Sequence, residues 1–119
     1  MDDSILRTIK ALLGPDSDYT VFDQDILIFI NGALSTLTQI GIGPSEGFRI
    51  TGENETWQDF LGDYDDLEPV KSYVYMKVRL MFDPPSNSSV LNAYKESCTE
   101  LEWRLNVAVD PGRYDNEKL

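Results

Sequence analysis

The sequence has 119 residues, of which 41% are hydrophobic, so it can form one folded domain with its own core and is not a disordered chain. Its formal net charge is −11, from 21 acidic and 10 basic residues, which disfavours broad binding to nucleic-acid phosphates or anionic membranes. With 0 histidines and one cysteine, the sequence excludes histidine-dependent nucleophiles, histidine zinc sites and an internal disulfide.

The N-terminal stretch, MDDSILRTIK, is acidic and lacks a signal-peptide pattern, so we expect the protein to be used without secretion. A first helix is predicted over residues 5–13. Ser4 is a suitable N-cap, and Gly14 followed by Pro15 favours termination. The expected apolar face consists of Ile5, Ile9, Leu12 and Leu13.

A second helix is predicted over residues 23–40. Asp23 is the expected N-cap, and Phe22 and Leu27 occupy the two positions of a hydrophobic staple. Gly32 lies in the middle of this helix, where glycine is unfavourable, so we expect a close contact with another backbone there. The predicted buried stripe consists of Ile26, Ile30, Ala33, Leu34 and Leu37.

The pattern changes over residues 41–65, where several glycines and a proline interrupt any long element. Apolar and polar residues alternate over 48–51, which is typical of a short extended segment. Thr56 and Asp59 have the spacing of a capping box, and they predict a short helix over residues 56–61. A loop of this length in a small domain is often functional.

Residues 67–82 predict a helix that is apolar around most of its circumference. Such a helix is normally surrounded by other elements, so we expect it to be the central element of the fold. Asp66 can cap it, Pro69 is tolerated in its first turn, and the prolines in residues 83–85 end it.

A last helix is predicted over residues 90–109, with Trp103 opposite its apolar stripe. We therefore expect an all-α fold, a small bundle of about four main helices plus a short one, in a single domain over 1–110 with a flexible tail at 111–119. Cys98 is expected to be buried as a small hydrophobe. The stripe consists of Leu91, Tyr94, Cys98, Leu101, Leu105 and Ala108.

The sequence contains few residue patterns that are typical of catalytic, phosphate-binding or metal-binding sites. The glycines in residues 41–44 lack the spacing and the lysine of a phosphate loop. An acidic cluster begins like a calcium-binding loop, but Leu67 stands in place of the third oxygen ligand and Val74 in place of the closing Glu. We expect no catalytic residue, no cofactor and no metal. The cluster consists of Asp63, Asp65, Asp66 and Glu68.

The remaining candidates are aromatic surfaces. Trp103 beside Arg104 has the composition of a binding anchor, although Trp103 could equally pack under the long loop or the first helix. Tyr75 and Phe82 form a second apolar face on the central helix. From the residues alone, the chain is a small acidic helical protein without catalytic equipment.

Several stretches resemble the head–tail connector (adaptor) proteins of tailed bacteriophages. The similarity runs from about residue 23 to residue 111. It implies a helical protein without enzymatic activity. The stretches that carry it are YVYMKVRLMFDPP (73–85), ELEWRLNVAVDP (100–111), DIL (25–27) through IN (30–31), LTQIGIG (37–43), FRIT (48–51) and TWQDF (56–60).

The resemblance also implies a place in the virion, at the head–tail junction, after assembly in the host cytoplasm and without a membrane. Many copies form a closed ring, about twelve-fold, beneath the portal protein. The ring extends the channel through which DNA passes without sequence-specific binding. It docks the stopper or tail-completion protein.

By position, the resemblance assigns portal insertion to residues 107–119 and contacts between neighbours to residues 41–65. A non-viral cytoplasmic helical adaptor or regulatory protein-binding module is the alternative. A carboxylate-dependent metal hydrolase built on the acidic cluster is a third, weaker hypothesis. The interface candidates are Phe48, Arg49, Tyr75, Phe82, Trp103, Arg104, Val107, Val109, Arg113 and Tyr114.

Overall fold

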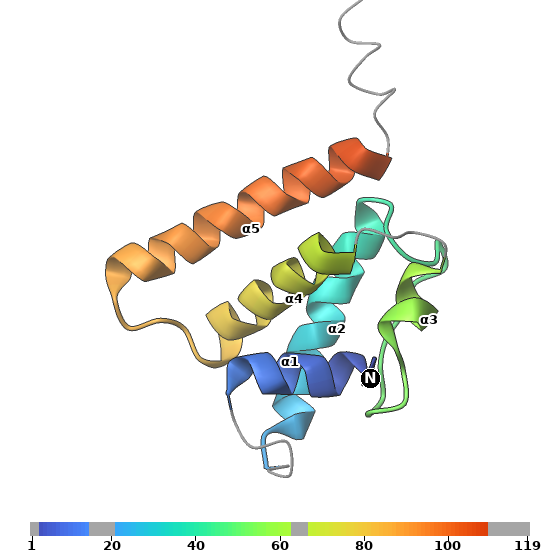
Figure 1. The fold of residues 1–119 in the computed structure, drawn as a ribbon, viewed down its shortest axis with the longest axis horizontal. Helices are drawn as coiled ribbons and strands as arrows, with labels where there is room; N and C mark the ends of the chain where they lie inside the picture. Colours follow the sequence, from blue (N-terminus) through green and yellow to red (C-terminus); the bar gives the residue numbers. More distant parts are fainter. Residues whose placement is uncertain (1–2, 15–20, 63–66, 110–119) are drawn as a thin grey trace, which may run out of the picture.

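The structure, a computed structural model, describes residues 3–14, 21–62 and 67–109, with the side chains of 108 and 109 left out. These residues form five helices and no β-strand, which confirms the predicted all-α fold (Figure 1). The helices are α1 (Ile5–Leu13), α2 (Asp23–Gln39), α3 (Trp57–Leu61), α4 (Leu67–Phe82) and α5 (Ser88–Val109).

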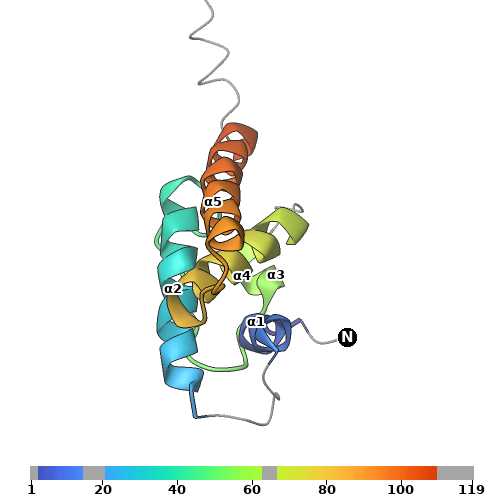
Figure 2. The same ribbon diagram turned by 90° about the vertical axis from the view of Figure 1, so that its left-hand side faces the viewer.

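Helix α4 is the central element, as its apolar circumference predicts. It packs against α1, α2 and α5. Figure 2 shows α2 along one side of the molecule and α1 and α3 toward the other, and Figure 1 shows α5 across the top. The fully buried side chains of α4 are Val70, Tyr73, Val74 and Val78.

Helix α1 begins and ends as predicted, but its buried face differs. The Ser4 hydroxyl accepts a hydrogen bond from Arg7 N at 3.3 Å, and Gly14 takes the left-handed conformation with φ 100°. Leu12, expected in the core, is exposed. Lys10 is buried in its place because its ammonium group binds Asp23 on α2. The buried residues of α1 are Ile5, Leu6, Ile9 and Lys10.

Two expectations for α2 are wrong. Asp23 is the first residue of the helix rather than its N-cap, and its carboxylate faces Lys10 across the interface with α1. Gly32 makes no close helix contact, because a methyl group placed on it would meet nothing within 4 Å. The buried stripe is confirmed, and its members are Ile26, Ile30, Ala33, Leu34 and Leu37.

The predicted short helix α3 is confirmed together with its capping box. Thr56 Oγ1 accepts from Asp59 N, and Asp59 Oδ2 accepts from Thr56 N, both at 3.0 Å. Main-chain hydrogen bonds join this helix to the start of α1, from Trp57 N to Asp3 O and from Ile5 N to Glu55 O, both at 3.1 Å. The pairing anchors the long loop to the N-terminal helix.

A single side chain holds the middle of the long loop. Asn31 on α2 accepts a hydrogen bond from Ile50 N at 2.7 Å and donates one to Ile50 O at 3.0 Å. It thus binds both main-chain groups of one residue, as a neighbouring strand would. The predicted extended segment at 48–51 is neither helical nor paired in a sheet, and this contact fixes it on α2. Ile50 is buried as a result.

Helix α5 lies on α4 through a mixed apolar and polar contact. Cys98 is buried as expected, and burial raises the pKa of its thiol. Tyr73 OH donates to Glu102 Oε2 at 2.6 Å. At the other end of the contact, Arg79 Nη1 donates to the hydroxyls of Tyr75 at 3.0 Å and Tyr94 at 3.3 Å. These hydrogen bonds add to the apolar contact between α4 and α5.

The Tyr73 contact predicts a loss of stability in alkali. Burial and the bond to Glu102 raise the pKa of Tyr73 above its ordinary value of 10.0. Above about pH 10 the unfolded chain loses this proton while the native state keeps it. The free energy of unfolding should then fall by up to about 1.4 kcal/mol per pH unit.

Urea unfolding between pH 8 and pH 11 checks this expectation. The variant Tyr73→Phe has no hydroxyl proton at this position, so it lacks this contribution to the fall of the free energy of unfolding with pH. The stability difference between wild type and variant should therefore be constant below pH 10 and shrink above it. A difference that is the same at every pH contradicts the prediction.

Candidate interaction surfaces

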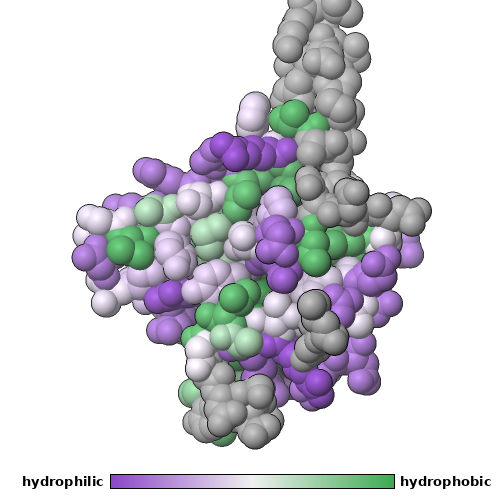
Figure 3. Space-filling model, viewed as in Figure 1, coloured by the Kyte–Doolittle hydropathy of each residue, from purple (hydrophilic) through white to green (hydrophobic). Residues whose placement is uncertain are grey.

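The outer face of α5 presents one large aromatic side chain. Trp103 is 59% exposed. Its neighbour Arg104 forms an ion pair with Glu100 one turn earlier, at 2.5 Å. On the face seen in Figure 3, hydrophilic side chains cover the upper edge of the molecule along α5, with apolar groups below it. This exposure favours the anchor interpretation of Trp103 over burial, and its binding role stays a prediction.

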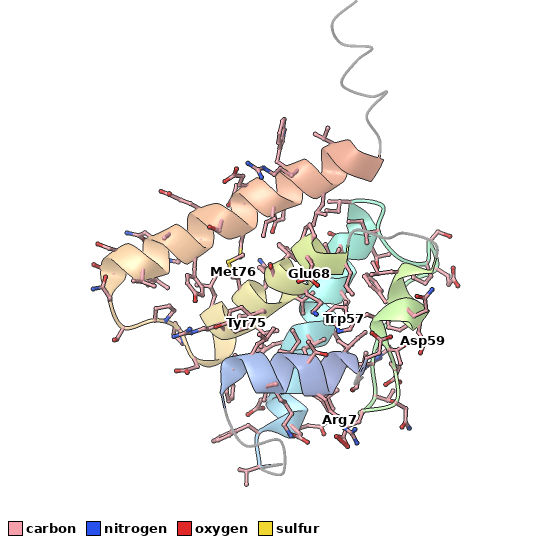
Figure 4. The ribbon with its side chains drawn as sticks, viewed as in Figure 1. Arg7, Trp57, Asp59, Glu68, Tyr75 and Met76 are labelled. Carbon is pink, nitrogen blue, oxygen red and sulfur yellow. The ribbon has the colours of Figure 1, made fainter. Side chains whose placement is uncertain are left out.

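The candidate residues of α4 are used within the chain. Tyr75, labelled in Figure 4, binds Arg79, and its ring lies 6.5 Å from that of Tyr94 on α5. The ring of Phe82 contacts that of Phe22 edge-on, with centroids 5.4 Å apart. Both side chains are partly buried. Their first role is therefore to join α4 to α5 and to the start of α2.

Phe48 and Arg49 lie together in a groove of about 720 Å³ between α2 and the long loop. Phe48 packs inward, with its ring 5.3 Å from that of Phe60. Arg49 is exposed, and within the described residues it makes no ion pair and no side-chain hydrogen bond. The groove is lined by Asn31, Ser35, Thr38, Gln39 and residues 45–49.

From Ile28 to the end of α2, the exposed face beside this groove carries no charge, a feature not recognised from the sequence. No Asp, Glu, Lys or Arg occurs in residues 26–45. Residues three or four positions apart lie on the same side of a helix, so the exposed residues of α2 in this run form one stripe along the helix. The sequence shows this feature as a run of uncharged residues, but the helical periodicity of apolar residues identifies only the buried side of a helix. The stripe consists of Ile28, Gly32, Ser35 and Gln39.

The other candidates lie at the C-terminal end. Val107 is partly buried. The side chain of Val109 and all of Arg113 and Tyr114 lie outside the described residues, as do the expected tail and most of the acidic cluster. Glu68, the described member of that cluster, is an ion-pair partner of Lys71 at 3.6 Å.

The described residues form neither a metal-binding cluster nor a membrane-spanning helix. They hold no group of three or more metal-ligating side chains. In the same part of the chain, no helix has the length and apolar composition needed to cross a membrane. The candidate binding surfaces among these residues are the exposed Trp103, the exposed Arg49 and the uncharged stripe of α2, and such groups occur in contacts with other macromolecules.

A family model described as Phage connector protein matches residues 5–112, which span all five helices. The chain belongs to the phage connector protein family. No curated protein and no solved structure matches it.

Membership gives this connector a structural role at the phage head–tail junction. It confirms the resemblance found in the sequence and favours that interpretation over an adaptor unrelated to virions. The match includes α1, which the resemblance had not covered. It also includes the long loop held by Asn31 and the contact between α4 and α5, so these features belong to the connector domain itself.

Proposed function

We propose that the protein is a head–tail connector subunit that assembles as a closed ring beneath the portal. The ring extends the DNA channel and docks the stopper or tail-completion protein. The family match over residues 5–112 carries this proposal. A ring needs a head-to-tail interface, with two different patches on each subunit. The α2 groove with Arg49 is a candidate for one of these patches, and the α5 face with Trp103 is a separate candidate for the contact with the portal.

The charge of the chain suits a channel. A net charge of −11 repels the phosphate backbone, so DNA can pass without being held. Assembly takes place in the host cytoplasm, and a ring of about twelve copies is the expected product. The carboxylates that line the channel come from the strongly acidic surface, whereas contacts between proteins use the surfaces with fewer charges.

Electron microscopy of the purified protein, alone and mixed with the portal protein of the same phage, tests the proposal. The expected result is an added ring of density on one end of the portal. The control is the portal alone in the same buffer. A well-folded protein that leaves the portal unchanged at every ratio contradicts the connector role.

Two variants locate the portal contact. Removal of the residues after Asp110 and, separately, Trp103→Ala should leave folding intact, because the truncation keeps all five helices and Trp103 is an exposed side chain. Each should weaken binding to the portal about tenfold or more, as expected for loss of an interface anchor. Biolayer interferometry on immobilised portal measures this loss. Thr99→Ala, an exposed change on the same helix, is the matched control.

Unchanged affinity of the truncated protein contradicts insertion of the tail into the portal. Unchanged affinity of Trp103→Ala contradicts the anchor role of that side chain. The two results are independent, since one variant changes the tail and the other changes the outer face of α5.

A further inference from the structure

The uncharged face of α2 is unusual for this protein. Charged residues make up 26% of the chain, yet none occurs in residues 26–45. The outer side of a surface helix normally carries charged and polar residues. Here it carries an isoleucine, Ile28, that is 61% exposed, followed by Gly32, Ser35 and Gln39. Depletion of charge on an exposed face is the compositional mark of an interface core.

The groove beside this face extends the surface onto the long loop. Asn31, Ser35, Thr38 and Gln39 line its α2 wall, and residues 45–49 line the other wall. The side chains of the α2 wall offer hydroxyl and amide groups, which form hydrogen bonds without bringing a net charge. The loop wall carries one acidic side chain, Glu46, and one basic side chain, Arg49. The Asn31–Ile50 contact holds the loop wall against α2, so the groove is part of the folded domain.

The net charge of the chain indicates which kind of molecule binds to the α2 face. Each copy carries a net charge of −11, so two copies repel each other over most of their surfaces. A basic partner gains most from an acidic face and has no advantage at an uncharged one. Another acidic molecule, by contrast, can approach most closely where the fewest carboxylates oppose it, and in this surface Glu46 is accompanied by Arg49. The α2 face therefore fits a second copy of this chain.

Arg49 adds a positive contribution at the edge of the same groove. Its guanidinium is exposed and makes no ion pair within the described residues. A neighbouring copy presents carboxylates over much of its surface. A guanidinium binds a carboxylate through two parallel hydrogen bonds, which also fixes orientation.

We infer that the α2 face, made of Ile28, Gly32, Ser35 and Gln39 with the groove at residues 45–49, is one side of the contact between neighbouring copies. This inference rests on the proposed ring and names one of its two patches. Since the contact is head-to-tail, the other side of each subunit supplies the complementary patch.

Site-directed photo-cross-linking identifies the occupant directly. The photoreactive residue p-benzoyl-phenylalanine replaces Ile28 in the full chain, and in a control protein it replaces Thr99 on α5. Complexes with the portal are irradiated and separated by denaturing electrophoresis. The expected product from position 28 is a ladder of connector multimers. A product that joins the connector to the portal instead, or no product from rings visible by microscopy, overturns the inference.

A charge substitution tests the energetic argument. Ile28→Glu places a carboxylate in the uncharged face, whereas Thr99→Glu adds the same charge to a face of α5 that already carries Glu96 and Glu100. Both positions are exposed, so both variants should keep the wild-type melting temperature. Ile28→Glu should weaken association between copies about tenfold or more, and Thr99→Glu should leave it near wild type.

The readout separates this inference from the proposed function. The number of connector copies per portal is counted by native mass spectrometry over a range of connector concentrations. If wild-type protein binds no portal at all, the connector proposal fails and the inference fails with it. If wild type and Ile28→Glu fill the portal equally, or both glutamate variants are impaired equally, the ring proposal survives and the α2 contact is wrong.

Discussion

Replacing Trp57 with alanine is expected to lower the free energy of unfolding by about 3–5 kcal/mol. Trp57 opens α3 and is only 2% exposed. Its indole Nε1 donates to Thr8 Oγ1 on α1 at 3.2 Å, and Figure 4 shows the side chain between α3 and α1. The substitution removes the largest core side chain and leaves a cavity. Since small domains have only about 5–15 kcal/mol in total, the variant should be near its stability limit.

Urea unfolding followed by circular dichroism measures the change, and the second tryptophan provides a matched control. Trp103→Ala removes the same side chain from an exposed position, so it should alter the free energy of unfolding by less than about 1 kcal/mol. Equal losses in the two variants contradict this assignment of core and surface. Trp57→Phe should be intermediate, because it keeps an aromatic ring and loses only part of the volume.

The substitution Asp23→Asn is expected to destabilise the fold by about 3 kcal/mol. Lys10 is only 2% exposed, and its Nζ lies 2.7 Å from Asp23 Oδ1. Without the carboxylate, a buried ammonium group loses a charge that offsets part of the cost of its desolvation. Loss of a negative charge at the start of α2 adds a smaller cost, about 0.5 kcal/mol, through the helix dipole.

The double variant Lys10→Met, Asp23→Asn separates these contributions. It buries no charge, and methionine can fill much of the space of the lysine chain, so most of the lost stability should return. The measurement is the midpoint of urea unfolding for wild type, the single variant and the double variant. A double variant that is no more stable than Asp23→Asn shows that the buried charge is not the cause.

Local signals predicted most of the helices. The capping pair Thr56 and Asp59 identified α3 because both partners are three residues apart. The stripe of α2 and the apolar circumference of α4 were also correct, since burial repeats with the period of the helix. These features depend on residues that are neighbours in sequence, so they can be read without knowing the fold.

The errors involve partners that are distant in sequence. Lys10 was not among the residues expected in the core, and its pairing with Asp23 helps to explain why it is buried while Leu12 is exposed. Asn31 was assigned no structural role, although an Asn within a helix can use its side chain to bind main-chain groups. Its partner, Ile50, lies in a loop whose position periodicity does not predict.

The surfaces were predicted less completely than the core. Trp103 was correctly placed opposite the buried stripe of α5, because that position follows from helix geometry. The uncharged outer face of α2 was missed, since a search for functional residues looks for reactive or charged groups and not for their absence. The roles assigned to the C-terminal residues depend on segments outside the described structure.

The hydrogen bonds between Asn31 and Ile50 also indicate where additional residues can be inserted into this protein. Ile50 and Glu55 are two fixed points, one bound to α2 and the other to the start of α1. Residues 52–54 between them contribute no buried side chain. Doubling the length of such a span costs only about 0.6 kcal/mol in closure entropy. A short peptide tag inserted there should leave both anchors in place and mark the outline of each subunit in images of the assembled particle.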